Sequence, residues 1–263
     1  MLRAISHGDV VQLELSSVAS RLMRYGVSAY VTRGVLIDTG FPDVGREVSA
    51  WLDANPVEGC LVTHAHEDHA GNIERLARRG VPIGVAPDSI TIARVPGPIG
   101  LYRRICWGVP EPLRAPITPF AHPALELRPA RGHSSDHHVV WDAERETLFG
   151  GDLFIGVKVR IAHRGEDLRA QVGALRDVIA LKPRRVFDGH RGILADPIAD
   201  LCAKADWIEE TIAAIEDRAR RGWSERAIRD DVLGREDLTG IASAGDYSRL
   251  NFVQSVVGTM EPG

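Results

Sequence analysis

His64-Ala65-His66-Glu67-Asp68-His69 places three imidazoles and two carboxylates within six residues. The motif directly follows a short apolar run that ends in Leu61 and Val62 and has the composition of a buried strand. A loop at a strand end can turn several nitrogen and oxygen donors toward one point, and neutral imidazole and carboxylate are ligands of zinc, iron and manganese. We therefore interpret residues 64–69 as a metal-binding loop rather than a solvated polar turn.

Three later segments place metal-capable side chains in matching positions. They are Gly132-His133, Gly151-Asp152 and Gly189-His190, and each follows a strand-like apolar run. The glycine in each pair allows the backbone to approach its neighbours closely. Sites in open α/β sheets form at such strand ends, so four loops in equivalent positions favour one shared site.

The chain alternates strand-like and helix-like segments up to about residue 195. Apolar patterning predicts strands over 10–15 and across 27–40, the latter as two strands joined by a tight turn at Arg33-Gly34. Helical spacing of apolar residues predicts further helices, among them 43–54 and 166–181. This alternation indicates layered sheets covered by helices.

Two other segments have a different character. Residues 87–124 are rich in proline and glycine and are too long for a simple connection, so we expect a loop with short helices over the site. From about residue 197 the pattern is helical, with Ser224 and Ser248 as expected helix starts. We therefore predict a catalytic domain over residues 1–196 and a helical extension over residues 197–263.

Composition narrows the classes of protein and partner. The 263 residues are 44% hydrophobic and 26% charged, which is ordinary for a globular chain and excludes disorder. A net charge of −4 gives no general drive toward nucleic acid or anionic membrane. The three cysteines form no CxxC pair, and no signal peptide or membrane-spanning run is visible. We expect a cytoplasmic protein with a small-molecule substrate and with neither nucleic acid nor membrane as a partner; a homodimer is left open.

With the motifs HxHxDH, GH, GGD and GH in this order, the chain resembles the metallo-β-lactamase-fold hydrolase superfamily and is similar to its glyoxalase-II-like members. The resemblance covers about residues 10–195 and includes the segment LIDTG at 36–40. It implies an α+β fold, a four-layered αβ/βα sandwich with a metal site at one edge of its two sheets. It also implies two divalent metal ions, with Zn²⁺ expected and iron or manganese as alternatives.

Carried over position by position, the resemblance implies seven metal ligands. The first ion is held by His64, His66 and His133. The second is held by Asp68, His69 and His190. Asp152 bridges both ions. Two ions sharing a water lower its pKa toward neutrality, so we expect a bridging hydroxide as the nucleophile. Asp68 is the expected catalytic side chain, which orients the water or passes a proton to the leaving group.

Two more residues have expected supporting roles. Asp38 is the charged residue of the apolar LIDTG segment, and we expect it to orient a ligand by hydrogen bonding rather than to bind metal. His137 lies four residues after His133 in GHSSDH, which resembles the GHTxGH of thioester-hydrolysing relatives. We expect a supporting or structural role for His137 too.

Three residues are candidate contacts for the substrate. Lys158 and Arg160 follow the Asp152 loop, where glyoxalase-II-like relatives bind a substrate carboxylate with basic residues; the alternative is an exposed strand. Tyr102 lies in the segment 87–124 and is a candidate contact from a lid.

We expect hydrolysis of a small-molecule thioester, lactone or related ester. The alternative is an endoribonuclease or phosphodiesterase acting on single-stranded RNA or a phosphodiester, with arginines of 218–229 as phosphate contacts. Those arginines equally fit a solvated helix face with acidic neighbours. A metal-binding sensor, an exported β-lactamase and a single-iron sulfur dioxygenase agree less well with seven complete ligand positions and no visible export signal.

Overall fold

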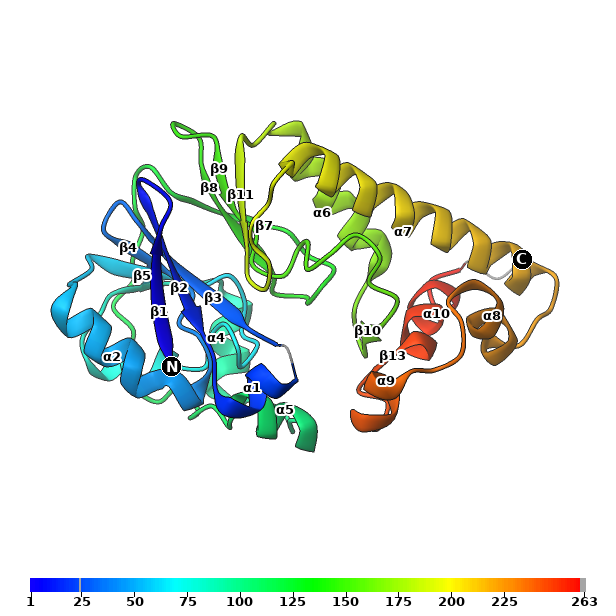
Figure 1. Cartoon of the computed structure of the whole chain (residues 1–263), viewed down its shortest axis with the longest axis horizontal. Coiled ribbons are helices and arrows are strands. Elements are labelled where there is room, and N and C mark those ends of the chain that lie inside the picture. The colour runs from blue at the N-terminus through cyan, green and yellow to red at the C-terminus, as the bar shows by residue number, and fades with distance from the viewer. Residues whose placement is uncertain (24, 261–263) are drawn as a thin grey trace.

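Two β-sheets packed face to face form the centre of the protein (Figure 1). The computed structural model describes residues 1–23 and 25–260. The first sheet has the strand order β1-β2-β3-β4-β5-β6 and the second has the order β12-β11-β9-β8-β7. Buried apolar side chains from both sheets fill the space between them: Val10, Tyr30, Val35, Ile37, Leu61, Leu125, Val140, Phe149 and Phe187.

The first sheet is antiparallel from β1 to β4 and parallel from β4 to β6. Its strands are β1 (Leu2–Ser6), β2 (Val10–Leu15), β3 (Val27–Thr32), β4 (Val35–Ile37), β5 (Gly59–Leu61) and β6 (Ile83–Gly84). The predicted turn joins β3 to β4, with positive φ angles of 51° at Arg33 and 73° at Gly34, as a two-residue hairpin requires. Helices α2 (Gly45–Ala54) and α3 (Ile73–Arg78) pack their apolar residues against the outer face of this sheet.

The second sheet contains β7 (Glu126–Pro129), β8 (His138–Asp142), β9 (Thr147–Phe149), β11 (Arg185–Asp188) and β12 (Gly192–Ile193). Helices α6 (Leu168–Ala180) and α7 (Pro197–Arg220) cover its outer face. Asp167 begins α6 by accepting hydrogen bonds from two backbone N–H groups of its first turn. The layers are therefore helix, sheet, sheet and helix, which confirms the predicted four-layered α+β sandwich.

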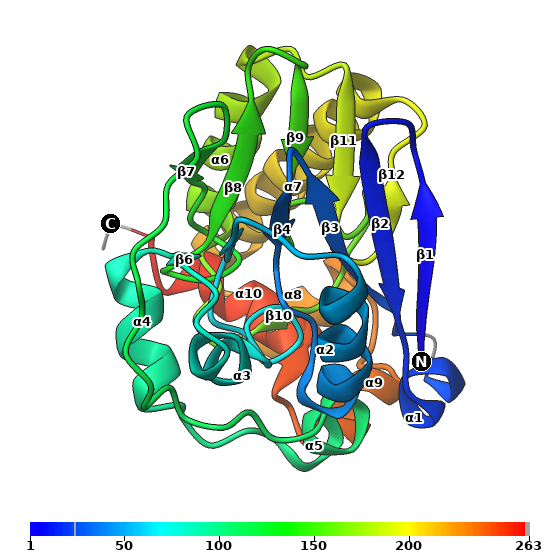
Figure 2. The same cartoon turned by 90° about the vertical axis from the view of Figure 1, so that its left-hand side faces the viewer.

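Short helices occupy the segment 87–124, as expected. They are α4 (Pro87–Arg94) and α5 (Leu101–Trp107). Another short helix, α1 (Val18–Leu22), follows β2, and a 3-10 turn, η1 (Pro42–Val44), precedes α2. Figure 2 shows α5 at the lower edge of the molecule, the edge on which α9 also lies.

The C-terminal helices pack on the second half of the sandwich. They comprise α8 (Glu225–Val232), α9 (Leu238–Ala242) and α10 (Arg249–Val257), and the short strand β13 (Tyr247–Ser248) pairs with β10 (Ala162–His163). Ser224 and Ser248 cap α8 and α10 as expected. One hydrophobic cluster runs from Val139 of the second sheet to Phe252 of α10, across the predicted boundary at residue 196. A separate extension from residue 197 stays a prediction.

Among residues 1–23 and 25–260, no helix combines the length and apolar character that crossing a membrane requires.

Candidate metal centre

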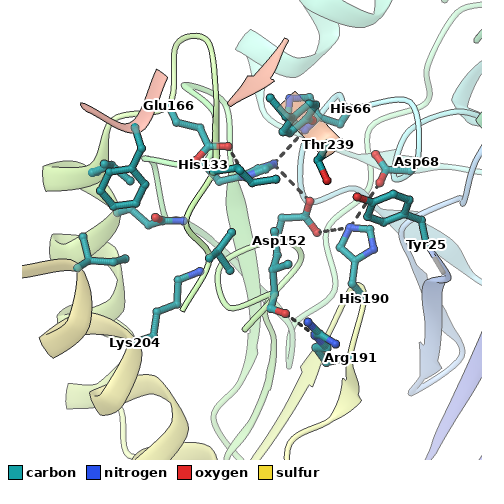
Figure 3. A pocket seen from close by; sticks show the side chains of 18 of the residues that line it. Tyr25, His66, Asp68, His133, Asp152, Glu166, His190, Arg191, Lys204 and Thr239 are labelled. Atoms are coloured by element: carbon teal, nitrogen blue, oxygen red, sulfur yellow. Dashed lines mark hydrogen bonds and ion pairs between the residues drawn. The ribbon is translucent and has the colours of Figure 1, made fainter. Parts of the chain in front are cut away.

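The structure brings all seven predicted ligands together at one edge of the two sheets. Figure 3 shows His66, Asp68, His133, Asp152 and His190 around this point. They lie in the loops that follow β5, β7, β9 and β11. Their donor atoms form two groups, and within each group these atoms lie within 4.8 Å of one another. One group is His64, His66, His133 and Asp152; the other is Asp68, His69, Asp152 and His190.

Asp152 belongs to both groups, and its two carboxylate oxygens face different ones. Oδ2 lies 3.3 Å from Nε2 of His133 in the first group. Oδ1 lies 2.9 Å from Nε2 of His69 and 3.2 Å from Nε2 of His190 in the second. One carboxylate therefore lies within reach of both donor groups.

Several of these buried donor atoms have no hydrogen-bond partner among the described residues. They include Nε2 of His64, Nε2 of His69 and Oδ1 of Asp152. Although the last two atoms are 2.9 Å apart, their geometry is not that of a hydrogen bond. Buried polar atoms are normally hydrogen-bonded, so unpartnered imidazole and carboxylate atoms aimed at one point fit divalent metal ions.

Each of three imidazoles is held from its Nδ1 side. Nδ1 of His69 lies 2.8 Å from Oδ2 of Asp38, and Nδ1 of His190 lies 2.9 Å from the carbonyl oxygen of Gly26. Nδ1 of His64 lies 3.0 Å from the Thr63 hydroxyl, which in turn contacts Asp38. These contacts leave Nε2 directed to the centre and fix the ring orientation.

His137 supports Asp152 rather than joining either donor group. Its Nδ1 lies 2.9 Å from the carbonyl oxygen of Ala130, so Nδ1 carries the proton. Its Nε2 then accepts the backbone N–H of Asp152 at 3.0 Å. The side chain thereby fixes the loop that carries the central carboxylate.

Burial and charge divide the imidazoles into two sets. Burial lowers the pKa values of His64 and His133 well below the usual range, and it lowers the pKa of His66 to about 4. Around the second group, burial is outweighed by carboxylates, chiefly Asp152, which raise the pKa of His69 and bring that of His190 to about 9. A metal ion must displace protons from these two rings, because only neutral imidazole binds metal.

An open cavity of about 200 Å³ lies beside the metal centre. Tyr102 lines it, as do His66, Asp68, His133, Asp152 and His190. Lys158 and Arg160 are exposed and do not line it, whereas Val159 between them does. The structure therefore places these two predicted substrate contacts outside the cavity.

Three charged residues at the site were not predicted in their roles. Arg103 of α5 contacts the carboxylate of Glu67 inside the metal-binding loop. Glu166 lies 3.7 Å from Nδ1 of His133, and Lys204 is buried in the cavity wall. Of these three residues, only Lys204 could have been identified from the sequence, because it is a charged residue on the apolar stripe of α7 formed by Leu201, Ala205 and Ile208.

The sequence model of the metallo-beta-lactamase superfamily matches residues 24–190, a range that contains all seven ligands. The chain belongs to the metallo-beta-lactamase superfamily. This agrees with the prediction of a hydrolase of this superfamily with residue groups able to hold divalent metal.

Relatives in this superfamily are distant. The chain is 26% identical over 200 residues to a beta-lactamase-like protein 2 homolog of Drosophila melanogaster, a match covering 69% of the chain and 64% of that protein, just under two thirds of its length. It is 26% identical over 180 residues to an atrochrysone carboxyl ACP thioesterase of Cryptosporiopsis sp. (strain 8999), covering 65% of the chain and 51% of that protein. Sixty residues, 22% of the chain and 19% of the other protein, are 43% identical to a hydroxyacylglutathione hydrolase of Pseudomonas putida (strain W619).

Solved structures share the same fold. A metallo-beta-lactamase family protein of Thermus thermophilus superposes with a TM-score of 0.65 at 15% identity, over 94% of this chain and 91% of that one. At this identity the likeness concerns the fold alone.

Proposed function

We propose that this protein is a dinuclear metal-dependent hydrolase that cleaves a small-molecule thioester, lactone or related ester. The observation that carries the proposal is the position of Asp152, whose two oxygens face two complete donor groups. Divalent ions, with zinc expected, would lower the pKa of a bound water and polarise the substrate carbonyl. His64, His66 and His133 would hold one ion, Asp68, His69 and His190 the other, and Asp152 both.

Asp68 is the side chain placed to move a proton. It lines the cavity, and its Oδ2 lies 3.5 Å from Nε2 of His190. Its carboxylate would accept the proton of the attacking water and deliver it to the leaving group. Tyr102 and Trp107 contribute to the cavity wall on the side of α5 and would limit the access of bulk water.

Two observations favour an ester over a phosphodiester. The cavity wall away from the metal centre is largely apolar, which suits an acyl group better than a nucleotide backbone. Most arginines of the segment 218–229 have acidic neighbours, such as Asp231 at 3.0 Å from Arg218 and Glu216 at 2.6 Å from Arg220. The thioesterase name of one relative agrees with this choice. We accordingly propose a small-molecule substrate rather than RNA.

The proposal is tested by metal analysis together with a substrate panel. Native protein should contain two divalent ions per chain and hydrolyse a thioester or lactone in preference to a phosphodiester or β-lactam. Asp152→Ala should abolish turnover and weaken both ions, whereas Asp53→Ala, on the exposed face of α2, should change neither. The proposal would be refuted if the protein bound only one ion per chain with metal in excess, or if it cleaved phosphodiesters and no ester, thioester or lactone.

A further inference from the structure

We propose that the inner part of the cavity is an acyl-binding site that takes an apolar chain and holds a carboxylate at the end of that chain on Lys204. This inference rests on the proposed ester or thioester hydrolysis and names its substrate class: thioesters in which one end of a dicarboxylic acid forms the scissile bond. The free carboxylate would lie at Lys204 and the scissile carbonyl at the metal centre.

The inner wall is built from apolar side chains of four segments. They come from the loop after β9 and from helices α6, α7 and α10: Ile155, Val159, Ile161, Leu168, Trp207, Ile208 and Phe252. Leu168, Ile208 and Phe252 are buried and belong to the core shared by the second sheet and the C-terminal helices, whereas the other four are partly exposed. Burial of a methylene chain against such a wall is favourable, whereas a short polar acyl group would leave it unfilled.

Lys204 interrupts this wall with a buried positive charge. The residue is 2% exposed, lines the cavity, and donates from Nζ to the carbonyl oxygen of Phe154 at 2.5 Å. No carboxylate within the described residues lies within 4.0 Å of Nζ. A buried ammonium without a counter-ion costs free energy, and an ammonium offers three donors of which Phe154 uses one. A ligand carboxylate would supply both the missing charge and an acceptor.

The acidic groups nearest to Lys204 have other partners. Glu166 receives the backbone N–H of His163 at 3.0 Å and faces His133, while Asp188 accepts the backbone N–H groups of Ile155, His190 and Arg191. Asp152 is committed to the metal centre. Figure 3 shows Lys204 reaching from α7 toward the space beside Asp152, with Glu166 next to His133.

Gln171 of α6 adds a second polar group to the same wall. It is 4% exposed and lines the cavity, and within the described part of the chain its side-chain amide makes no hydrogen bond to protein. An amide can donate to a carboxylate beside an ammonium. Lys204 and Gln171 therefore supply two hydrogen-bond donors to the apolar wall of a cavity that Glu166 also lines.

The test compares thioesters that differ only at the far end of the acyl chain. Each dicarboxylic monothioester from succinyl to suberoyl is paired with the fatty acyl thioester of equal chain length on the same thiol. We expect one chain length at which kcat/KM favours the carboxylate. Lys204→Met should lower this preference at least tenfold, chiefly through KM, while Lys182→Met, at an exposed position, should leave it unchanged.

If Lys204 only holds Phe154 in place, Lys204→Met would lower kcat/KM equally for both thioesters of a pair. The ratio of the two kcat/KM values would then be the same in Lys204→Met as in the native protein, and this result would overturn the inference. A binding measurement covers the case in which Lys204→Met does not fold or no thioester is hydrolysed. Calorimetry with the native holoprotein should show tighter binding of a free dicarboxylate than of the monocarboxylate of equal length. Tighter binding without any hydrolysis supports the site and refutes the proposed function, whereas equal binding overturns the site.

Discussion

The guanidinium of Arg103 makes a bidentate contact with the carboxylate of Glu67, and both side chains are almost completely buried. Glu67 lies between two metal ligands of the loop after β5, so the pair ties α5 to the metal centre. Arg103 also lies 3.8 Å from Asp246 and 5.8 Å from the ring centroid of Tyr247. The same side chain therefore joins α5 to the C-terminal part of the chain.

Arg103→Met should lower the free energy of unfolding by about 3–5 kcal/mol, because it leaves the Glu67 carboxylate buried without its partner. Chemical denaturation of the metal-loaded protein measures this. The double variant Arg103→Met/Glu67→Gln should recover part of the loss, since no lone charge stays behind. Arg79→Met removes the exposed pair with Asp53 and should cost at most about 1 kcal/mol. Additive effects of the two buried substitutions would contradict the coupling.

Asp38→Asn should weaken the second metal ion about 10- to 100-fold, because Asp38 orients His69 through Nδ1. Asn is the suitable replacement, since residue 38 has φ 61° and Asn tolerates this left-handed conformation. Competition with a chromophoric chelator gives the two affinities separately. The ion held by His64, His66 and His133 should be affected less, and Asp53→Asn should affect neither. Equal weakening of both ions would indicate a general loss of structure instead.

The ligand set could be predicted because its motifs resemble those of the superfamily, and because the loops that carry the ligands follow strands whose ends lie at one edge. The sequence did not predict β1, whose side chains are mostly exposed and show no apolar alternation. The short helix α9 was missed for a similar reason, since five residues with exposed Leu238 and Ile241 give no helical stripe. Arg103 and Glu67 are 36 residues apart in the sequence, and their contact depends on where α5 packs in the fold. Local sequence patterns do not predict such a contact.

Gly189→Ala should reduce metal content and turnover, because a methyl group at this position would lie 2.6 Å from Cε1 of His69 and 3.0 Å from Oδ1 of Asp152. Both neighbours are donor residues of the second group, so neither can move without disturbing the site. Gly150→Ala is the matched control, since its nearest neighbour would be 3.7 Å away. Elemental analysis and thioester turnover of the two variants check the prediction. Equal metal content in both variants would contradict it, because the backbone at residue 189 would then have shifted to accommodate the methyl group.

The preference for a carboxylate-bearing acyl group should be lost as the pH rises through about 8. Burial lowers the pKa of Lys204 to about 8, although the carboxylates of Asp188, Glu166 and Asp152 oppose this shift. The ammonium that would bind the substrate carboxylate is therefore present below this pH, and about nine tenths of it is gone one unit above. Titrations at the metal centre affect both members of a substrate pair and cancel in the ratio of their kcat/KM values, which reports the free enzyme. A profile of this ratio from pH 6 to 10 should fall with its midpoint near the pKa of Lys204. Burial also raises the pKa of Glu166, which lines the same cavity, to about 8, so its ionisation adds to the fall by repelling the substrate carboxylate. The fall should therefore be smaller in Lys204→Met and should persist in Glu166→Gln, and a wild-type ratio that stays constant to pH 10 would exclude the ammonium as the anchor.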